Sequence, residues 1–408
     1  MDHKKELLLR KIHETIDYSR EMEEAEVKNL IAECLTEYGR QEFLTLKEKE
    51  KLGKELFYAI RKLDILQEIL EDTEITEIMI NGPDHIFIEK KGRLYAWENC
   101  FSSQEKLEDI IQQIASKCNR VINEAFPIVD ARLEDGSRVN AVLPPVVLDG
   151  PVLTIRRFPG EPVDMERLIQ LGSLPREAAF WLKLLVQAGY NIFISGGTGS
   201  GKTTFLNALS EYIPREERII TIEDSAELQI RDAPNLIRME TRNANGEGCR
   251  EITIRDLIRT SLRMRPDRLI VGEVRGGEAL DLLQCLNTGH DGSLSTGHAN
   301  SARDMLSRLE TMALMGMDLP LPAIRRQIAS GIDIIVHLGR LRDKTRKVLE
   351  IAEVSGMDQE EIRLETLCIF EETSEKGERE VRGKLVYKKE LSDRQKLAAA
   401  GLPELPAF

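Results

Sequence analysis

Eight consecutive residues give the strongest chemical signal of this sequence. Residues 196–203 are Gly-Gly-Thr-Gly-Ser-Gly-Lys-Thr, which fits the pattern G-x-x-x-x-G-K-[ST]. The pattern directly follows an apolar stretch typical of a buried strand and directly precedes a stretch typical of a helix, as a phosphate-binding loop requires. Such a string is expected by chance in only about 1% of chains of this length, given average residue usage. The sequence therefore predicts a site for a nucleoside triphosphate.

The residue types of this loop match the chemistry of a polyphosphate. Glycines let successive backbone N–H groups turn toward the β-phosphate, and a side chain at Gly199 or Gly201 would block that approach. We expect Lys202 to supply positive charge to the β- and γ-phosphates, and the hydroxyl of Thr203 to ligate Mg²⁺. The predicted ligands are ATP and Mg²⁺, and the predicted nucleotide-binding residues are Gly197, Thr198, Gly199, Ser200, Gly201, Lys202, Thr203 and Thr204.

Two acids follow apolar strand-like stretches elsewhere in the chain. The stretch 269–271 leads to Gly272 and Glu273, so glycine stands where a phosphate-loop enzyme usually has its Walker-B aspartate. Glu273 is predicted to orient and deprotonate the attacking water, directly or through Mg²⁺. The stretch 219–222 leads to Glu223, which we expect to make a second contact to metal or water, because parallel strands end around one crevice. Either acid also fits an ordinary surface or capping role.

A glycine- and hydroxyl-rich segment, residues 288–300, contains His290 and His298, two of the six histidines of the chain. A lone histidine is more often structural than catalytic. A neutral imidazole in this segment could nonetheless report the presence of the γ-phosphate to neighbouring elements. Both histidines are therefore candidate site residues.

The apolar pattern divides the chain into four parts that would position these residues. Residues 1–65 show helical spacing and predict an amphipathic helical extension. Residues 66–158 combine short strands and turns with one helix, which predicts an α+β domain. Residues 159–174 begin with a Pro-Gly-rich break and predict a linker. Residues 175–408 alternate buried strands with helices, which predicts an α/β domain with a parallel sheet, followed by a C-terminal hairpin appendage.

Composition narrows the class of protein. The 408 residues are 41% hydrophobic and 31% charged, a globular balance long enough for two or three domains. No apolar run approaches the roughly 20 residues that cross a bilayer, and the N-terminus lacks the pattern of a secretory signal. Six cysteines without C-x-x-C spacing indicate reduced thiols rather than a zinc site or a disulfide framework. The predicted location is cytoplasmic, and the net charge of −13 argues against nonspecific attraction to nucleic acid. No sequence-specific nucleic acid is predicted as a partner.

With these motifs in place, the chain resembles the secretion ATPases of type II and type IV systems, and most closely the CpaF-like ATPases of tight-adherence (Flp) pili. The resemblance extends over about residues 66–354. Besides residues 196–203, it rests on blocks that begin at Thr76 (Thr-Glu-Ile-Met-Ile-Asn-Gly-Pro), Asp130 (Asp-Ala-Arg-Leu-Glu-Asp-Gly-Ser-Arg-Val-Asn), Leu153 (Leu-Thr-Ile-Arg-Arg-Phe), Ile222 (Ile-Glu-Asp), Arg263 (Arg-Met-Arg-Pro-Asp-Arg), Val271 (Val-Gly-Glu-Val-Arg-Gly) and Gly297 (Gly-His-Ala-Asn-Ser).

The resemblance implies a fold and a set of roles. It implies a PAS-like N-terminal domain, a RecA-like motor domain and a ring of six subunits on the inner face of the cell membrane, in contact with platform proteins of a pilus or secretion system. It assigns Glu223 to the Asp box, Glu273 to an atypical Walker B, and His290 and His298 to the His box. It also implies that three arginines of the N-terminal domain reach the phosphates as arginine fingers, although ordinary salt bridges would explain them too: Arg132, Arg138 and Arg156.

The preferred interpretation is an ATP-hydrolysing motor that assembles a tight-adherence pilus or a related secretion system. One alternative is a conjugation-type ATPase that exports protein or nucleic acid. A different class is a nucleotide-gated scaffold that does not hydrolyse ATP, although the presence of both Glu223 and Glu273 argues against it. A small-molecule kinase remains a further possibility, but no segment resembles a pocket for an acceptor substrate.

Overall fold

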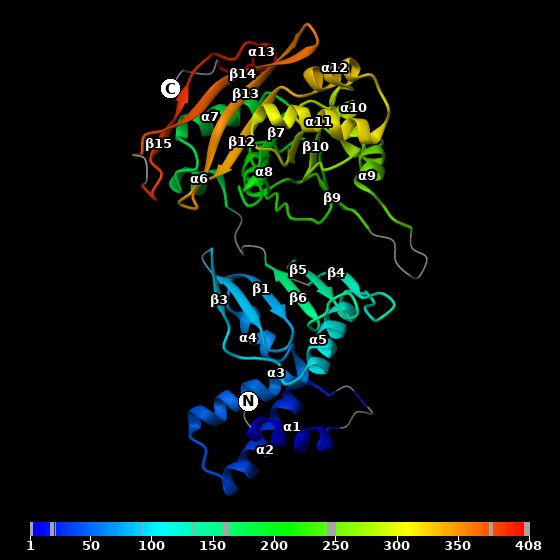
Figure 1. Cartoon of the computed structure of the whole chain (residues 1–408), viewed down its shortest axis with the longest axis vertical. Helices are drawn as coiled ribbons and strands as arrows, with labels where there is room; N and C mark the ends of the chain where they lie inside the picture. The colour runs from blue at the N-terminus through cyan, green and yellow to red at the C-terminus, as the bar shows by residue number, and fades with distance from the viewer. Residues whose placement is uncertain are drawn as a thin grey trace. The chain divides into compact units, whose positions relative to one another are not determined.

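The computed structural model describes residues 3–16, 20, 22–90, 92–133, 135–157, 163–242, 250–374 and 378–403. The chain divides into two compact units, Met1–Gly160 and Glu161–Phe408, which are described separately below. Figure 1 shows the helices and strands of both units.

The first unit begins with amphipathic helices over the range for which the sequence predicts them. Its helices are α1 (His3–Thr15), α2 (Glu24–Gln41), α3 (Leu46–Arg61) and the short α4 (Ile65–Glu71). Apolar residues at helical spacing, such as Leu8 and Ile12, share one face and are fully buried in a small core. A capping box fixes the start of α3, because the Thr45 side chain accepts a hydrogen bond from the Glu48 backbone N–H. A buried ion pair of 3.1 Å joins Lys5 to Asp64.

A six-stranded antiparallel sheet forms the rest of the first unit. Its strands are β1 (Ile75–Asn81), β2 (Ile86–Lys90), β3 (Arg93–Ala96), β4 (Ile128–Arg132), β5 (Arg138–Val142) and β6 (Val152–Arg156), in the order β3-β2-β1-β6-β5-β4. The buried residues of β1, including Ile78 and Ile80, alternate with more exposed ones, as a sheet with one covered face requires. Helix α5 (Gln104–Lys117) contributes Leu107, Ile111 and Ile114 to the core on that face.

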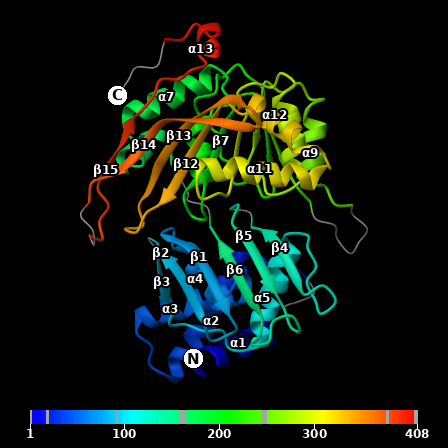
Figure 2. The same ribbon diagram turned by 45° about the horizontal axis from the view of Figure 1, so that its top comes forward.

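The second unit is built on a nine-stranded sheet. Its strands are β7 (Ile192–Gly196), β8 (Ile219–Glu223), β9 (Leu236–Glu240), β10 (Arg268–Val271), β11 (Leu294–Gly297), β12 (Ile334–Arg340), β13 (Arg346–Asp358), β14 (Glu361–Glu372) and β15 (Gly383–Tyr387), in the order β15-β14-β13-β12-β7-β11-β10-β8-β9. The six strands from β12 to β9 run parallel, and β13, β14 and β15 extend the sheet as an antiparallel meander. Figure 2 shows this sheet from a second direction.

Helices cover both faces of the parallel strands, which explains why β7, β8, β10 and β11 are buried along their whole length. The helices are α6 (Met165–Gln170), α7 (Arg176–Gln187), α8 (Lys202–Ser210), α9 (Ile254–Ser261), α10 (Glu278–Leu286), α11 (Ala302–Gly316), α12 (Leu321–Gly331) and α13 (Gln395–Ala399). Ile192 and Ile194 pack into one core with residues of α6, α7 and α8, whereas Phe193 packs into another with residues of α9 to α12. Successive side chains of a strand point to opposite faces, so one short strand serves both cores.

Three features differ from the sequence predictions. Helix α6 lies within the range predicted as linker, 159–174, and buries Met165 in the core of the second unit; residues 158–162 lie outside the described residues. The predicted C-terminal hairpin is present as β14 and β15, with Cys368 opposite Tyr387, but it continues the central sheet instead of standing apart. Strand β11 was not predicted, yet it lies between β7 and β10 at the centre of the parallel strands.

Two further expectations concern cysteines and membrane spans. All the cysteines that the structure describes are free, and Cys249 falls in a range outside them. None of the helices in the described ranges combines the length and the apolar character needed to cross a bilayer.

Candidate nucleotide site

The phosphate-loop pattern forms the turn between β7 and α8, as predicted. Gly199 has φ +72° and Gly201 has φ +92°, backbone conformations that residues with a Cβ adopt only with strain. Gly196 has no space for a side chain, because an added Cβ would lie 2.6 Å from the carbonyl oxygen of Leu338. Gly197, Thr198 and Gly199 are exposed, whereas Ser200 is buried. The loop is thus a glycine-dependent cradle at the N-terminus of a helix, where unpaired backbone N–H groups face an anion.

Lys202 lies at the centre of the predicted residues that the fold brings together. Its side chain is only 7% exposed, and Nζ lies 3.3 Å from the carbonyl oxygen of Gly197 and 3.2 Å from Nδ1 of His298. Burial lowers the pKa of Lys202 below its ordinary value, and the charge of Glu273 partly opposes that shift. No carboxylate of the described chain forms an ion pair with this ammonium group, so its charge is available for phosphate oxygens.

His298 links Lys202 to the candidate general base. Its Nε2 lies 2.8 Å from Oε1 of Glu273. Burial, and next the charge of Lys202, lower the pKa of His298, so the ring is neutral near pH 7. A neutral ring can accept at Nδ1 from Lys202, whereas Nε2 lies close to Oε1 of Glu273 without a hydrogen bond, because that oxygen has no hydrogen-bond partner among the described residues. Strand β11 explains the placement, because His298 directly follows its last residue while the phosphate loop follows the adjacent strand β7.

Glu273 follows β10 and has a second partner that the sequence did not single out. The guanidinium of Arg275 donates to Oε2 of Glu273 at 2.7 Å, and its other amino group lies 3.6 Å from Asp224. This hydrogen bond to Glu273 is the largest cause of the raised pKa of Arg275. The position of this arginine, two residues after the candidate general base, was the sequence signal that could have indicated it. The arginine holds the carboxylate in one orientation beside the phosphate loop.

Glu223 occupies the space that a Walker-B aspartate would need. An added Cβ at Gly272 would lie 3.0 Å from Cγ of Glu223, so a side chain there would compete with this acid. Oε2 of Glu223 accepts from the backbone N–H groups of Glu227, at 2.6 Å, and Leu228, at 2.8 Å. Oε1 is buried without a partner among the described residues, and burial raises the pKa of the carboxyl group. The absence of an aspartate at position 272 is therefore explained by packing, because the side chain of Glu223 fills the adjacent space.

Arg340 and Arg346, at the two ends of the turn between β12 and β13, lie beside the phosphate loop. The sequence analysis predicted neither contact. Nε of Arg346 donates to the carbonyl oxygen of Gly199 at 2.9 Å. Nη1 of Arg340 would lie 3.6 Å from a Cβ added at Gly199. β12 ends beside β7, and its partner strand β13 begins six residues later, so both flanks of the turn face the loop. A basic turn after an apolar strand is too common a pattern to have indicated this contact.

His290 lies at the other end of β11 from His298. Its Nδ1 is 3.3 Å from the carbonyl oxygen of Cys285 and 3.4 Å from the hydroxyl of Thr288. Because β11 runs between the two histidines at about 3.3 Å per residue, the fold separates His290 from the phosphate loop. The structure therefore does not bring His290 to the cluster around Lys202, and its predicted role would have to be indirect.

The three predicted arginine fingers form one row on the sheet of the first unit. Arg132 of β4 is directly opposite Arg138 of β5, and Arg138 is opposite Arg156 of β6. Residues directly opposite in an antiparallel pair share a face, and like charges in that relation are destabilising. Glu77 of β1 continues the row beside Arg156. Their predicted role as arginine fingers stays a prediction, because the phosphate loop belongs to the other unit.

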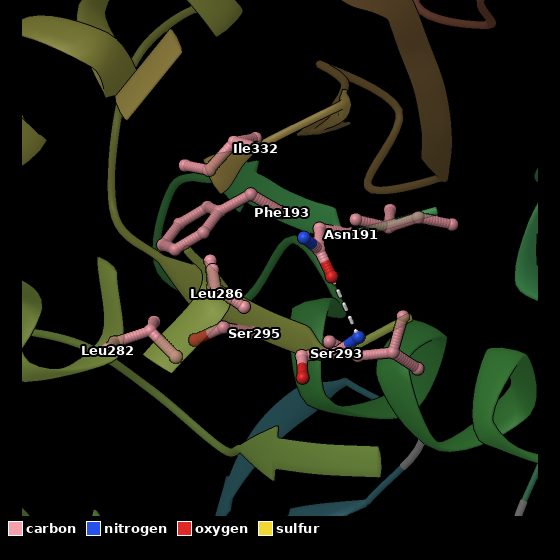
Figure 3. A pocket seen from close by; sticks show the side chains of 9 residues that line it. Asn191, Phe193, Leu282, Leu286, Ser293, Ser295 and Ile332 are labelled. Atoms are coloured by element: carbon pink, nitrogen blue, oxygen red, sulfur yellow. Dashed lines mark hydrogen bonds between the residues drawn. The ribbon is translucent and has the colours of Figure 1, made fainter. Parts of the chain in front are cut away.

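Two cavities in the second unit differ in what they can hold. A void of about 10 Å³ lies between β7, β11 and α10, lined by residues such as Phe193, Leu282 and Ser295 (Figure 3). That volume admits at most a single water molecule. A pocket of about 490 Å³ opens beside the phosphate loop, next to Thr198 and His298, and is large enough for a nucleotide group.

The residues present fit Mg²⁺ and a triphosphate. The loop offers positive-φ glycines and a buried ammonium group, and the first turn of α8 contains the half-buried hydroxyls of Thr203 and Thr204. Among the residues that the structure describes, no group of three or more His, Cys, Asp or Glu is arranged to hold a metal. Mg²⁺ usually binds through one or two protein oxygens together with phosphates and water, so the hydroxyl of Thr203 and the unpaired Oε1 of Glu223 are the oxygens that would hold it.

The fold and the site together define a phosphate-loop nucleotide-binding protein with a largely parallel, helix-covered sheet. The chain belongs to the type II/IV secretion system protein family, whose pattern matches residues 60–398. It is 32% identical over 324 residues to the conjugal transfer protein TrbB of Rhizobium radiobacter, covering 77% of this chain and 96% of the relative. It is 35% identical over 315 residues to the type IV secretion system protein PtlH of Bordetella pertussis, covering 71% and 93%.

A solved structure supports the fold independently. The ATPase DotB of Legionella pneumophila aligns with a TM-score of 0.52 at 22% identity, covering 72% of this chain and 80% of that one. The predicted membership of a type II/IV secretion family is therefore confirmed. The finer resemblance to tight-adherence pilus ATPases is not, since the relatives above are described as conjugal transfer and type IV secretion proteins.

Proposed function

We propose that this chain is the ATP-hydrolysing motor of a conjugation-type, type IV secretion system that exports protein or nucleic acid. Family membership implies an ATPase, and the names of the TrbB and PtlH relatives favour this kind of system. The proposal includes a RecA-like motor domain, a PAS-like N-terminal domain and a ring of six subunits. The motor would work in the cytoplasm, at the inner face of the membrane, on platform proteins of the secretion apparatus.

One observation supports hydrolysis over mere binding. The continuous contact from Lys202 through His298 to Glu273 places a carboxylate beside the phosphate cradle, at 2.8 Å from the imidazole and 2.7 Å from Arg275. A scaffold that only binds nucleotide needs no acid oriented toward an attacking water. Bound Mg²⁺ would neutralise charge on the β- and γ-phosphates.

The residues of the chain divide the work of hydrolysis between them. Lys202 binds the phosphate oxygens, which replace its present contacts to Gly197 and His298. Glu273 accepts a proton from water as the water oxygen attacks the γ-phosphorus and the bond to the β-phosphate oxygen breaks. Release of Lys202 frees Nδ1 of His298, so arrival of nucleotide changes the contacts of the imidazole that lies beside Glu273. The arginine row of the first unit would add positive charge when the ring assembles.

Steady-state phosphate release by the purified full chain tests the hydrolytic assignment. We expect Glu273→Gln to lower kcat by at least about a hundredfold, because the base is lost while the shape of the site is kept. Lys202→Ala should abolish tight nucleotide binding. Substitution of the exposed Glu360, far along the chain near β14, is the control and should leave the rate unchanged. Wild-type turnover in Glu273→Gln protein would refute the assignment.

Assembly of a tight-adherence pilus is the second candidate. It is favoured by the blocks around Thr76, Asp130, Val271 and Gly297, which resemble the CpaF-like ATPases. A chromosomal Lys202→Ala allele separates the two functions. Loss of surface pili with normal transfer of protein or DNA would favour the pilus, whereas loss of transfer with normal piliation would favour the conjugation-type system.

A further inference from the structure

The pocket of about 490 Å³ beside the phosphate loop extends beyond the residues that the proposed reaction uses. Its lining includes Gly197 and Thr198 from the loop, His298 and Asn300 from the segment after β11, and Ser307 and Arg308 from α11. Only the loop residues and His298 belong to the predicted site. The pocket therefore joins the phosphate cradle to a surface of α11 that has no assigned role.

The sequence of α11 explains why one face of this helix lines the pocket. Asp304, Ser307 and Arg308 are separated by three and four residues, the spacing that places side chains on the same face of a helix. The opposite positions, such as Met305 and Leu309, are fully buried in the core under the sheet. Burial of that apolar face directs the polar face, with Arg308, toward the phosphate loop.

Arg308 is the cation of this face. No ion pair or hydrogen bond to Arg308 occurs among the described residues, whereas other arginines of the second unit, such as Arg275 and Arg325, pair with carboxylates. Asp304 also lines the pocket, one turn away. An anion that entered from the loop side would meet the guanidinium of Arg308 and the amide group of Asn300 on one wall, and the cradle on the other. Guanidinium groups match the geometry of phosphate oxygens.

We propose that this pocket is a subsite for a phosphoryl oxyanion, bound by Arg308 together with His298 and Asn300. The proposal rests on the proposed ATPase function. The oxyanion has two possible sources, the terminal phosphoryl group of bound ATP and the inorganic phosphate released by hydrolysis. In both cases Arg308 contacts the group that distinguishes ATP from ADP, so it makes the site sensitive to the third phosphate.

Binding of three probes to the full chain, in the presence of Mg²⁺, tests the subsite: a nonhydrolysable ATP analogue, ADP and inorganic phosphate. Arg308→Ala is compared with Arg308→Lys, which keeps the charge, and with Arg303→Ala. Arg303 is an exposed arginine of the same helix that does not line the pocket, so it is a matched control. Because Arg308 and Arg303 are both exposed, all three variants should fold, which thermal unfolding verifies.

If the terminal phosphoryl group is the ligand, Arg308→Ala weakens binding of the ATP analogue by about tenfold, leaves ADP binding unchanged, and is partly rescued by lysine. If released phosphate is the ligand, binding of inorganic phosphate and product inhibition by phosphate are weakened instead. Arg308→Ala protein that binds all three probes as the Arg303→Ala control does would overturn the subsite. Failure of the ATPase assignment is distinguishable, because the wild type would then release no phosphate from ATP, while the binding titrations would still decide whether Arg308 binds an oxyanion.

Discussion

Both ends of the parallel strands in the second unit contain a lysine and a buried glutamate, but these groups have different partners at the two ends. At the carboxyl ends, Lys202 contacts only a carbonyl oxygen and an imidazole, and Oε1 of Glu223 has no partner among the described residues. At the amino ends, Lys396 contacts Asp291 at 2.8 Å and Asp333 at 2.7 Å. Glu353, 2% exposed, accepts backbone hydrogen bonds from the segment that leads into α13.

This difference in charge pairing distinguishes a structural end of the sheet from the end that contains the candidate site. Buried charges are stable when paired and costly when left unpaired. The amino-end group, defined here as Asp291, Asp333, Glu353 and Lys396, meets this requirement internally and fastens the C-terminal segment to the base of the sheet. The carboxyl-end group, defined here as Lys202 and Glu223, lacks such partners, and in the proposed function a bound triphosphate with Mg²⁺ would supply them. Incomplete pairing is thus the physical mark of the site.

Two lysine substitutions should show the difference between the two ends of the sheet most clearly. Lys202→Met should lower ATPase activity by at least about a hundredfold with little change in stability, because its charge is paired with no carboxylate of the described residues and is expected to act on bound phosphate. Lys396→Met should instead lower the free energy of unfolding by about 2 kcal/mol, since it leaves two carboxylates uncompensated in a partly exposed position. Phosphate release and chemical denaturation of both variants check this. Similar catalytic loss in both, at equal folded fraction, would contradict the division between the two ends.

The acid of the amino-end group provides a second test. Glu353→Gln removes the charge that accepts from the backbone N–H groups of Ser392, at 2.9 Å, and Asp393, at 2.8 Å. We expect a loss of about 1–2 kcal/mol of stability with unchanged activity per folded molecule. The measurement is urea denaturation followed by an ATPase assay at low temperature. A fall in kcat without a fall in stability would show that the C-terminal segment affects catalysis.

Gly272→Ala tests whether the position of Glu223 in the carboxyl-end group matters for activity. The added methyl group would lie 3.0 Å from Cγ of Glu223 and displace that acid by a few tenths of an ångström. We expect kcat to fall about tenfold, as misplacement of a metal-contacting acid does. Gly39→Ala is the matched control, because nothing lies within 4 Å of its added Cβ. Unchanged kcat would mean that the position of Glu223 does not matter.

Arg346→Ala should have a smaller effect on the same end of the sheet. It removes the 2.9 Å hydrogen bond to the carbonyl oxygen of Gly199, so the loop becomes less well ordered before nucleotide arrives. We expect KM for ATP to rise about fivefold, corresponding to one hydrogen bond of about 1 kcal/mol, with kcat nearly unchanged. Arg342, on the same turn and paired with Glu372, provides the control substitution. An equal change in Arg342→Ala protein would indicate a general effect of charge.

The titration of His298 should give the smallest effect. Burial and Lys202 hold its folded-state pKa below the ordinary value of 6.5, so acidification favours the unfolded chain, which binds the proton first. The stability that the neutral ring contributes is fully present above pH 6.5 and is lost as the pH falls through the lowered pKa. Between pH 8 and pH 5 the wild type should lose more free energy of unfolding than His298→Asn does. The difference should be less than about 1 kcal/mol, since the side chain of His298 is partly exposed. Denaturation curves between pH 8 and pH 5 measure this difference, and a wild type that gains stability on acidification would refute it.

Much of the fold followed from local patterns. The helical spacing before residue 65, the apolar strands β7, β8 and β10, and the loop of residues 196–203 are each encoded within a few consecutive residues. Strand β11 was missed because three of its four residues, Ser295, Thr296 and Gly297, are small and lack an apolar side chain, and only their position between two parallel neighbours buries them. Pairing between distant segments, rather than propensity, makes this stretch a strand.

The sequence by itself determined the class of chemistry in this protein, because a phosphate cradle needs glycines, a lysine and a hydroxyl at fixed spacing along the chain. Only the tertiary structure decided which other side chains share that chemistry. The order of the strands brought His298 to Lys202 and left His290 at the opposite end, and it placed Glu223 in the space beside Gly272. The physical reason is that backbone conformation depends on near neighbours, whereas proximity at the end of a sheet depends on contacts between segments tens of residues apart.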